Sequence, residues 1–443
     1  MTFRYLALGI AVVVCLVART SHAQQAYGPI TGGTVVNPTP LISPTNGVPL
    51  SDGAVLHAGV SVEGGYDSNL FYNDDEKVGS ALLRINPFLD LTNASRSGEA
   101  PTGLFFDLRA GLSYREYLNS DPAIRRLRAV QPTATVNLEH NSGGTVVVGV
   151  ADTYARLQDA PYTRLGANDD LIIRDNNLAT AQLRWSPGGG RLQATLRYTN
   201  MIDWFETAQL KAGDSMTNEG MLDVSWRWLP KTALYVQVRQ GYIKYLNPNA
   251  PQATNLVPGD LGGKQNSYPL RALVGIRGLI TEKTSIALAV GYQNAFYQAG
   301  QTTTGFFGST TVAGELIVLP LLTTKLTFGA HHDFQNSVIG NFFYDDGVYA
   351  SVSHQLVSRL IAQVWGAYDH RRYYGLPAGP ALDPRVDDLL QGTALLDFYI
   401  RAWAYIGASY SVSRNRSDYA PAQTFSGTNY TKQVVFGHVG LTY

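Results

Sequence analysis

The sequence predicts an all-β fold, a single transmembrane antiparallel β-barrel of about 18 strands with short periplasmic turns and long extracellular loops. Apolar and polar residues alternate along short segments from residue 54 to the end, and short and long connections alternate between these segments. The 443-residue chain is also only 15% charged, although it has 26 Tyr and 44 Gly. Period-2 alternation puts successive side chains on opposite faces of a strand, so one face suits lipid and the other suits water.

The first segment illustrates the alternation. Leu56, Ala58 and Val60 share one face, and His57 and Ser61 lie on the other. The same pattern recurs near residues 83–92, 192–199 and 222–228, whereas residues 146–156 fit either register. We found no stretch with the 3.6-residue period of an amphipathic helix.

The connections give the strand number. Short turns are expected near residues 93–102, 141–144, 187–190, 230–232, 281–284, 320–323, 356–359 and 399–401. Longer polar connections are expected near residues 66–80, 119–126, 158–173, 203–217, 246–266, 298–309, 336–343, 374–387 and 413–431. Strict alternation of the two kinds requires an even number of strands, 18, with both chain ends on the short-turn side. A propeller or β-solenoid also has many short strands, but it predicts neither this alternation nor a continuous apolar face.

The N-terminus predicts export. A positive residue, an apolar stretch over residues 6–17 and a small-x-small site at residues 21–23 have the form of a signal peptide, here residues 1–23. Residues 24–53 are rich in Pro and Gly and are expected to form a periplasmic arm, which leaves residues 54–443 for the barrel. Beyond the first 20 residues no apolar run is long enough for a membrane-spanning helix.

Composition excludes several classes of function. The net charge is zero, with 34 Lys and Arg against 34 Asp and Glu, so no overall charge excess favours nucleic acid as a partner. The one cysteine, Cys15, lies within the expected signal peptide, which argues against disulfides and cysteine chemistry. The histidines are scattered over different strands and show no convincing partner pattern, so we expect no catalytic residues. The sequence has no HExxH, EF-hand or cysteine metal motif, so we also expect no cofactor and no metal.

Two short motifs resemble known outer-membrane proteins. The C-terminal residues Val439, Leu441 and Tyr443 share a face and are similar to the signal by which the barrel-insertion machinery recognises its substrates. Residues 64–71, GGYDSNLF, resemble the opening motif of the "β-barrel porin 2" group of outer-membrane porins. Some members of this group have been proposed as outer-membrane exits for secreted polysaccharide, and others are associated with surface gliding machinery.

The resemblance implies an outer-membrane porin that is the exit of a secreted polysaccharide. Its implied partners are the outer membrane with its lipopolysaccharide, the polymer itself and a periplasmic polysaccharide-export protein. A general diffusion porin, a structural barrel of a gliding-motility complex and a barrel enzyme are the alternatives. The residue pattern by itself implies only a pore.

The strand faces predict which side chains line that pore. An 18-stranded barrel is too wide for its own side chains to fill, so a water-filled channel is expected. A basic arc is expected from Arg184, Arg197, Arg227, Arg239, Arg271 and Arg277, with Asp223 as an acidic neighbour. An acidic arc is expected from Glu315, Asp333, Asp369 and Asp397, with Lys325 as the basic exception. Opposed arcs would orient a charged solute across the pore.

Inward aromatic rings could stack on sugar rings. The candidates are Tyr235, Tyr349, Trp365, Trp403 and Tyr405. Ordinary lumen residues that pair with their strand neighbours are the alternative for the charged side chains. For the aromatic rings, the alternative is packing against an inward-folded loop or a position near the rim.

Overall fold

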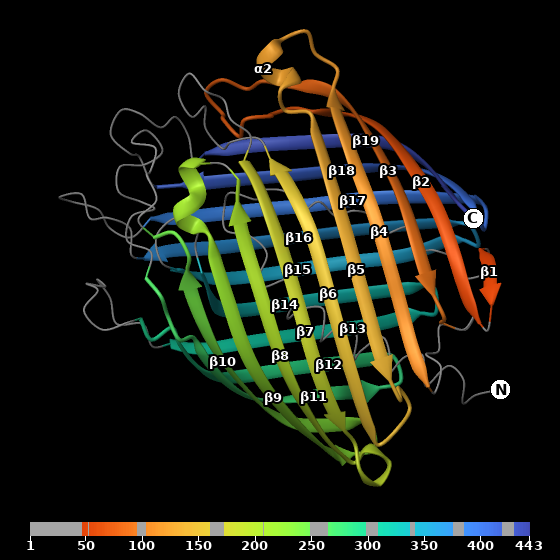
Figure 1. The fold of residues 1–443 in the computed structure, drawn as a ribbon, viewed down its shortest axis with the longest axis vertical. Helices are drawn as coiled ribbons and strands as arrows, with labels where there is room; N and C mark the ends of the chain where they lie inside the picture. The colour runs from red at the N-terminus through yellow and green to blue at the C-terminus, as the bar shows by residue number, and fades with distance from the viewer. Residues whose placement is uncertain are drawn as a thin grey trace.

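The chain forms one antiparallel sheet that closes on itself as a barrel (Figure 1). The computed structural model describes residues 47–51, 53–94, 103–159, 172–206, 208–248, 265–297, 309–336, 342–374, 385–418 and 429–443. Strands β2 (Ala54–Asp67) and β19 (Tyr430–Thr442) pair with each other, with Gly65 opposite Phe436, and so join the two ends of the sheet. Closure gives every strand from β2 to β19 a partner on each side, and the predicted fold class is confirmed.

The barrel wall consists of the 18 strands from β2 to β19, each paired with its neighbours in sequence. The strands between β2 and β19 are β3 (Ser80–Thr92), β4 (Leu104–Tyr117), β5 (Ala129–His140), β6 (Val146–Asp159), β7 (Ile172–Trp185), β8 (Leu192–Phe205), β9 (Ser215–Leu229), β10 (Thr232–Tyr245), β11 (Leu270–Thr281), β12 (Thr284–Asn294), β13 (Ser309–Leu321), β14 (Thr324–Asn336), β15 (Phe342–Val357), β16 (Leu360–Tyr374), β17 (Val386–Arg401) and β18 (Ala404–Ser417).

The connections alternate as predicted. Two residues separate β9 from β10, β11 from β12, β13 from β14, β15 from β16 and β17 from β18. The long connections leave the opposite end of the barrel and include α2 (Pro122–Arg125) and the 3-10 turn η3 (Ala208–Gly213), whereas η2 (Gly188–Gly190) lies in a short turn. One predicted turn is misplaced, because β17 continues to Arg401 and the turn falls at residues 402–403 instead of 399–401.

The helical segments are short. Asp121 accepts a hydrogen bond from the backbone N–H of Ala123, and Pro122 occupies the first turn of α2, an arrangement that favours helix initiation. No helix among the described residues has the length and apolar character needed to cross a membrane.

The outer surface of the barrel carries a broad belt of exposed apolar side chains. On β12, for example, Leu288 and Val290 are 46% and 48% exposed. Val146, Val148 and Val150 are exposed in the same way, which fixes the register of the strand that the sequence left undecided. A closed barrel with an apolar outer surface can satisfy every backbone group in lipid, so the strands are the membrane-spanning elements.

Part of the expected N-terminal arm is a strand. Val48–Ser51 forms β1, which pairs with the beginning of β2. The last residue, Tyr443, exchanges two backbone hydrogen bonds with Ala58, at 2.8 and 3.2 Å, so β19 and β1 follow one another along the same edge of β2. The expected signal peptide and the arm up to residue 46 lie outside the described residues.

Two adjacent leucines test which face meets lipid. Leu396 is 44% exposed on the outer face of β17, and Leu395 points into the barrel. We expect Leu396→Arg to lower the free energy of unfolding in lipid vesicles by about 2–4 kcal/mol, since arginine near the bilayer midplane is costly. Leu395→Arg should change it much less. Urea titrations followed by tryptophan fluorescence compare the two, and equal losses would contradict the assigned faces.

Candidate channel lumen

The predicted basic residues lie on β7 to β11, where most of their outer neighbours are apolar. Arg197, for example, lies between Leu196 and Tyr198, which are 56% and 49% exposed, so its side chain points inward. Arg184 behaves similarly between Leu183 and Trp185. Because side chains alternate along a strand, these arginine side chains point into the lumen.

Three of these arginines have neutral hydrogen-bond acceptors. Arg197 Nη2 donates to Gln182 Oε1 at 3.2 Å, and Arg239 Nε donates to Gln237 Oε1 at 2.8 Å. Arg184 Nη2 donates to the backbone carbonyl of Ser142 at 3.2 Å and also lies 3.6 Å from Glu139 Oε1. The Arg227 side chain is exposed near the short-turn end of β9. This part of the wall presents several arginines to the lumen.

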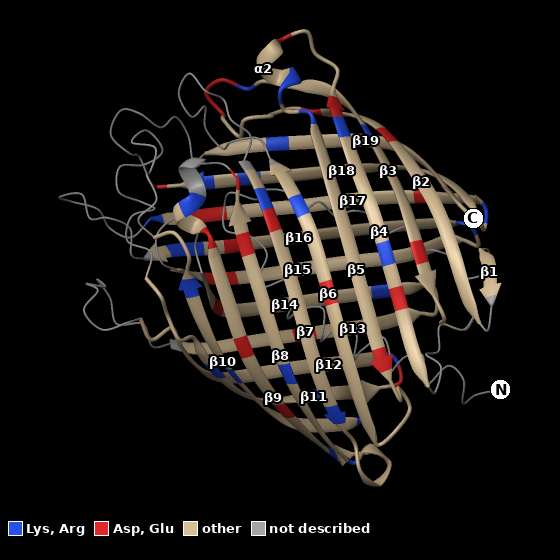
Figure 2. Ribbon diagram, viewed as in Figure 1, with Lys and Arg blue, Asp and Glu red and all other residues tan. Residues whose placement is uncertain are grey.

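The remaining two basic residues form ion pairs with carboxylates. Arg277 Nη2 lies 3.0 Å from Asp223 Oδ1, and its guanidinium covers the Tyr235 ring. Arg271 Nε lies 3.3 Å from Asp333 Oδ1, so a residue of the predicted basic arc forms an ion pair with a residue of the predicted acidic arc. Positive and negative positions also interleave along the strands (Figure 2). The predicted separation into opposed arcs is therefore incomplete, because long side chains reach across neighbouring strands.

The predicted acidic residues are also paired. Glu315 accepts a hydrogen bond from the Tyr349 hydroxyl at 2.6 Å, and Asp397 lies 2.7 Å from His438 Nε2. Asp369 lies 3.5 Å from Arg371 Nη2. Arg371 follows Asp369 by two residues on the same strand face, so Lys325 is not the one basic side chain of this arc.

Three predicted sugar-stacking rings lie over glycines of a neighbouring strand. Tyr235 is opposite Gly275, Tyr349 is opposite Gly329 and Tyr405 is opposite Gly440. A Cβ added to any of these glycines would lie 2.1–2.6 Å from the ring. The rings therefore cover the glycine backbone and form part of the wall, where only glycine leaves room for them.

The two tryptophans differ in position. Trp365 lies on β16 between the exposed Val364 and Gly366 and points inward. Trp403 does not lie on a strand. It occupies the turn between β17 and β18 and is 50% exposed, because the strand begins one residue later, at Ala404. The prediction that Trp403 lines the lumen was therefore wrong.

The connection between β2 and β3, residues 68–79, folds over the lumen at the long-loop end. Leu70 and Phe71 are buried against inward side chains of the barrel wall, including Tyr117 and Phe436. The next residue, Tyr72, contacts Tyr430 edge-on with ring centroids 4.9 Å apart and also packs against Leu389 of β17. Since these partners come from β4, β17 and β19, the loop narrows this end of the barrel.

Polar contacts hold the same loop in place. Asn69 Nδ2 donates to the backbone carbonyls of Asn73 and Thr431 at 3.0 and 3.1 Å. Lys432 Nζ lies 2.8 Å from Asp67 Oδ2 and 4.1 Å from the centre of the Tyr72 ring. Tyr72 has a φ of 53°, which is uncommon for a residue other than glycine. Several independent contacts thus fix Tyr72 in its position.

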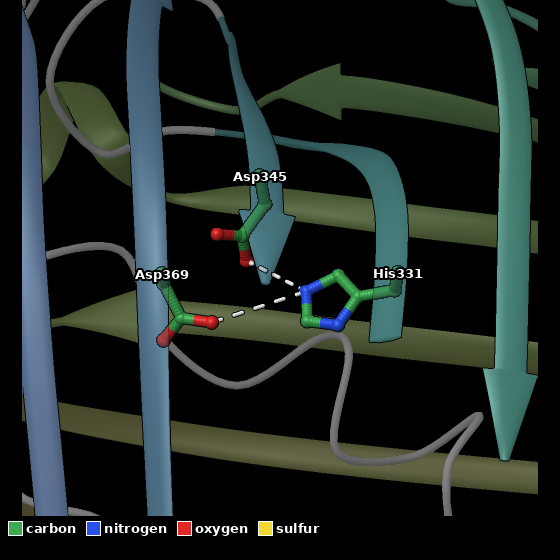
Figure 3. A group of neighbouring side chains, drawn as sticks. All are labelled: His331, Asp345 and Asp369. Atoms are coloured by element: carbon green, nitrogen blue, oxygen red, sulfur yellow. Dashed lines mark ion pairs between the residues drawn. The ribbon is translucent and has the colours of Figure 1, made fainter. Parts of the chain in front are cut away.

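Three inward residues from three adjacent strands lie together near the long-loop end. His331 of β14, Asp345 of β15 and Asp369 of β16 point toward one another (Figure 3). The sequence did not predict that Asp345 lies beside His331, because the pairing of β14 with β15 follows a long connection whose length does not fix the register. Asp369 does not pair with its neighbour His370, which lies on the outer face, where its Nδ1 is 2.9 Å from Asp388 Oδ1.

Comparisons with protein-family models and with curated proteins found no match. Among solved structures, the barrel is similar to OccAB3 and OccAB4 of Acinetobacter baumannii, with TM-scores of 0.46 and 0.45, 11% identity, 88% of this chain covered and 99% and 98% of those chains. It is also similar to the siderophore receptor PirA of Pseudomonas aeruginosa, with a TM-score of 0.42, 7% identity and coverage of 89% and 81%. Similarities this weak assign neither a substrate nor a partner to this chain.

The position of Tyr72 can be tested by removing its ring. Tyr72→Ala removes an aromatic pair and a cation–π contact, together worth about 1–2 kcal/mol, so the loop should leave the lumen roughly ten times more often. We expect a higher mean single-channel conductance in planar lipid bilayers. Tyr410→Ala, which removes a ring from the outer face, is the matched control. An unchanged conductance in Tyr72→Ala would show that the loop does not limit passage.

Proposed function

We propose that this protein is an outer-membrane channel for a hydrophilic solute, and that the solute is a secreted polysaccharide on its way out of the cell. The observation that supports a channel is the closed wall of 18 strands, apolar outside and polar inside. Barrels of 16–18 strands are wide enough to leave an aqueous passage. The short turns then face the periplasm and the long connections face outward.

Two features of the lumen favour a carbohydrate. A sugar chain presents many hydroxyl groups and flat C–H faces, so it suits a wall of hydrogen-bonding side chains and aromatic rings. Arg197 and Arg239 supply donors beside glutamines, and Tyr349 and Trp365 supply inward rings that are only partly buried. A solute that uses both kinds of contact could move from one to the next without a single tight site.

The residues that resemble the "β-barrel porin 2" group have definite positions in the barrel. Gly65 lies beneath the Phe436 ring, where a Cβ would approach within 2.5 Å of the ring. Asp67 pairs with Lys432, and Leu70 and Phe71 form the base of the loop that narrows the lumen. We infer that this motif sets the strand-to-loop exit from which residues 68–79 turn into the lumen, which supports a role in passage of the solute.

The proposal includes partners at both ends of the barrel. At the short-turn end, a periplasmic polysaccharide-export protein would deliver the polymer near β1 and the barrel's short turns. Tyr443, the last residue, would be read by the insertion machinery when the barrel enters the outer membrane. The outer surface would contact lipid and lipopolysaccharide.

A deletion strain tests the polysaccharide assignment. We expect loss of the gene to abolish surface polysaccharide, to leave polymer in the periplasm, and to be reversed by the wild-type gene. Normal surface polysaccharide in the deletion strain would contradict the assignment and favour a general diffusion porin or a barrel of a motility complex. If the protein is a general diffusion porin, the purified protein would still conduct ions.

Charge reversal tests the lumen. The double variant Arg197→Glu, Arg239→Glu should shift ion selectivity toward cations in planar bilayers, because four units of charge change inside a confined pore. It should also fail to restore polysaccharide export although it inserts normally. The matched control is Arg414→Glu, Arg416→Glu, which makes the same charge change at exposed positions on the outer face of β18. Equal selectivity shifts in the two variants would argue against a conducting lumen.

A further inference from the structure

His331, Asp345 and Asp369 each offer one atom to a common point inside the barrel wall (Figure 3). His331 Nε2 lies 3.5 Å from Asp345 Oδ2 and 4.0 Å from Asp369 Oδ1, and the three atoms lie within 4.8 Å of one another. Two atoms that bind the same zinc ion tetrahedrally, each about 2.1 Å from it, are roughly 3.4 Å apart. The spacing is therefore close to that of a set of metal ligands.

A glycine creates the space between these side chains. Gly347 of β15 lies directly between His331 of β14 and Asp369 of β16 in the strand register. A Cβ at Gly347 would approach within 2.2 Å of His331 Cε1 and 2.5 Å of Asp369 Oδ1. Any other residue would fill the position where the two side chains approach each other.

Arg371 orients the two carboxylates. Its Nε lies 3.4 Å from Asp345 Oδ1, and its Nη2 lies 3.5 Å from Asp369 Oδ2. These contacts engage one oxygen of each carboxylate, and the other oxygen turns toward His331. Gln335 Nε2 also donates to Asp345 Oδ2 at 3.2 Å, which leaves that oxygen a second lone pair. Outer contacts of this kind commonly hold metal ligands in position.

His331, Gly347 and Asp369 form one row of cross-strand neighbours, and a second row of the same kind in this barrel provides a comparison. Asp397 of β17 and His438 of β19 reach toward each other over Gly407 of β18, as His331 and Asp369 do over Gly347. There the histidine and aspartate form a direct hydrogen bond of 2.7 Å. In the first row the corresponding atoms are 4.0 Å apart, and a third ligand atom faces the gap. The second row is thus a closed pair and the first an open one.

We propose that His331, Asp345 and Asp369 bind one divalent transition-metal ion, Zn²⁺ in the first instance. One imidazole and two carboxylates suit this class of ion, whereas Ca²⁺ and Mg²⁺ favour sites made of oxygen ligands. The His331 side chain is 22% exposed, which leaves room for water as a fourth ligand. The metal-binding motifs that the sequence lacks are short local patterns. Their absence does not bear on this site, because its residues come from three different strands. The proposal does not depend on which solute the channel passes.

Metal counting on the whole protein tests the proposal. The protein is purified in detergent with a tag free of histidine, treated with EDTA, equilibrated with Zn²⁺ and freed of excess metal. We expect one Zn²⁺ per chain by mass spectrometry of the metal, and Co²⁺ in its place should give the visible absorption of a low-symmetry site. Because histidine binds metal only when deprotonated, Zn²⁺ binding should weaken as the pH is lowered.

Three variants and two controls locate the site. His331→Ala and Asp369→Asn should lower the affinity for Zn²⁺ at least tenfold. Gly347→Ala should do the same although all three ligands remain. His438→Ala and Gly407→Ala, which alter the closed pair, should leave Zn²⁺ binding unchanged. Circular dichroism and the heat-dependent shift in gel migration that is typical of folded barrels confirm that each variant is folded.

Two results would overturn the proposal. The first is a folded wild-type protein that takes up no Zn²⁺ after treatment with EDTA, which would mean that the two carboxylates and Arg371 simply enclose a protonated His331. The second is a folded His331→Ala or Asp369→Asn variant that still binds one Zn²⁺ with wild-type affinity, which would place the metal elsewhere.

Discussion

Backbone hydrogen bonding in lipid is the constraint on which the rest of this structure depends. No water is available in the membrane core, so each strand must find both of its partners within the sheet. The pairing of β2 with β19 meets this requirement by joining the two ends of the sheet. Once the sheet is closed, period-2 alternation decides the environment of every side chain: odd positions meet lipid and even positions meet the lumen, or the reverse.

The lumen therefore collects many of the charged side chains of the wall, and opposite charges meet there. Ion pairs such as Arg277 with Asp223 and Arg271 with Asp333 join strands that are not direct neighbours. Partial burial strengthens such pairs, and each also removes charge that a passing solute would otherwise meet. Arg197 and Arg239, which donate to glutamines, are consequently better placed to act on a solute than arginines whose charge is already balanced.

The sequence was sufficient for the fold and only partly sufficient for the site. Strands, turns and lumen faces follow from alternation and turn residues, which are local properties, and the barrel with its 18 strands was confirmed. Contacts such as Arg271 with Asp333 need the lateral reach of a side chain across several strands, which alternation does not give. The two-residue turn between β15 and β16 does fix that register, and it could have identified Asp345 opposite Arg371. The pairing of β14 with β15 could not be obtained this way, because a long connection allows several registers.

Glycines in the wall decide which inward side chains can meet. Each one removes a side chain from a row of cross-strand neighbours, so the residues on the flanking strands can close over the gap. Where one neighbour is aromatic, as Tyr349 beside Gly329, the ring covers the backbone and stiffens the wall. Where the neighbours are histidine and aspartate, the gap becomes polar, and its width decides the chemistry. At Gly407 the gap is closed by a hydrogen bond, and at Gly347 it remains wide enough for an ion. A glycine in the wall thus allows aromatic packing at one position and leaves a gap for a ligand at another. The strand register decides which case applies, because it decides which side chains flank the glycine.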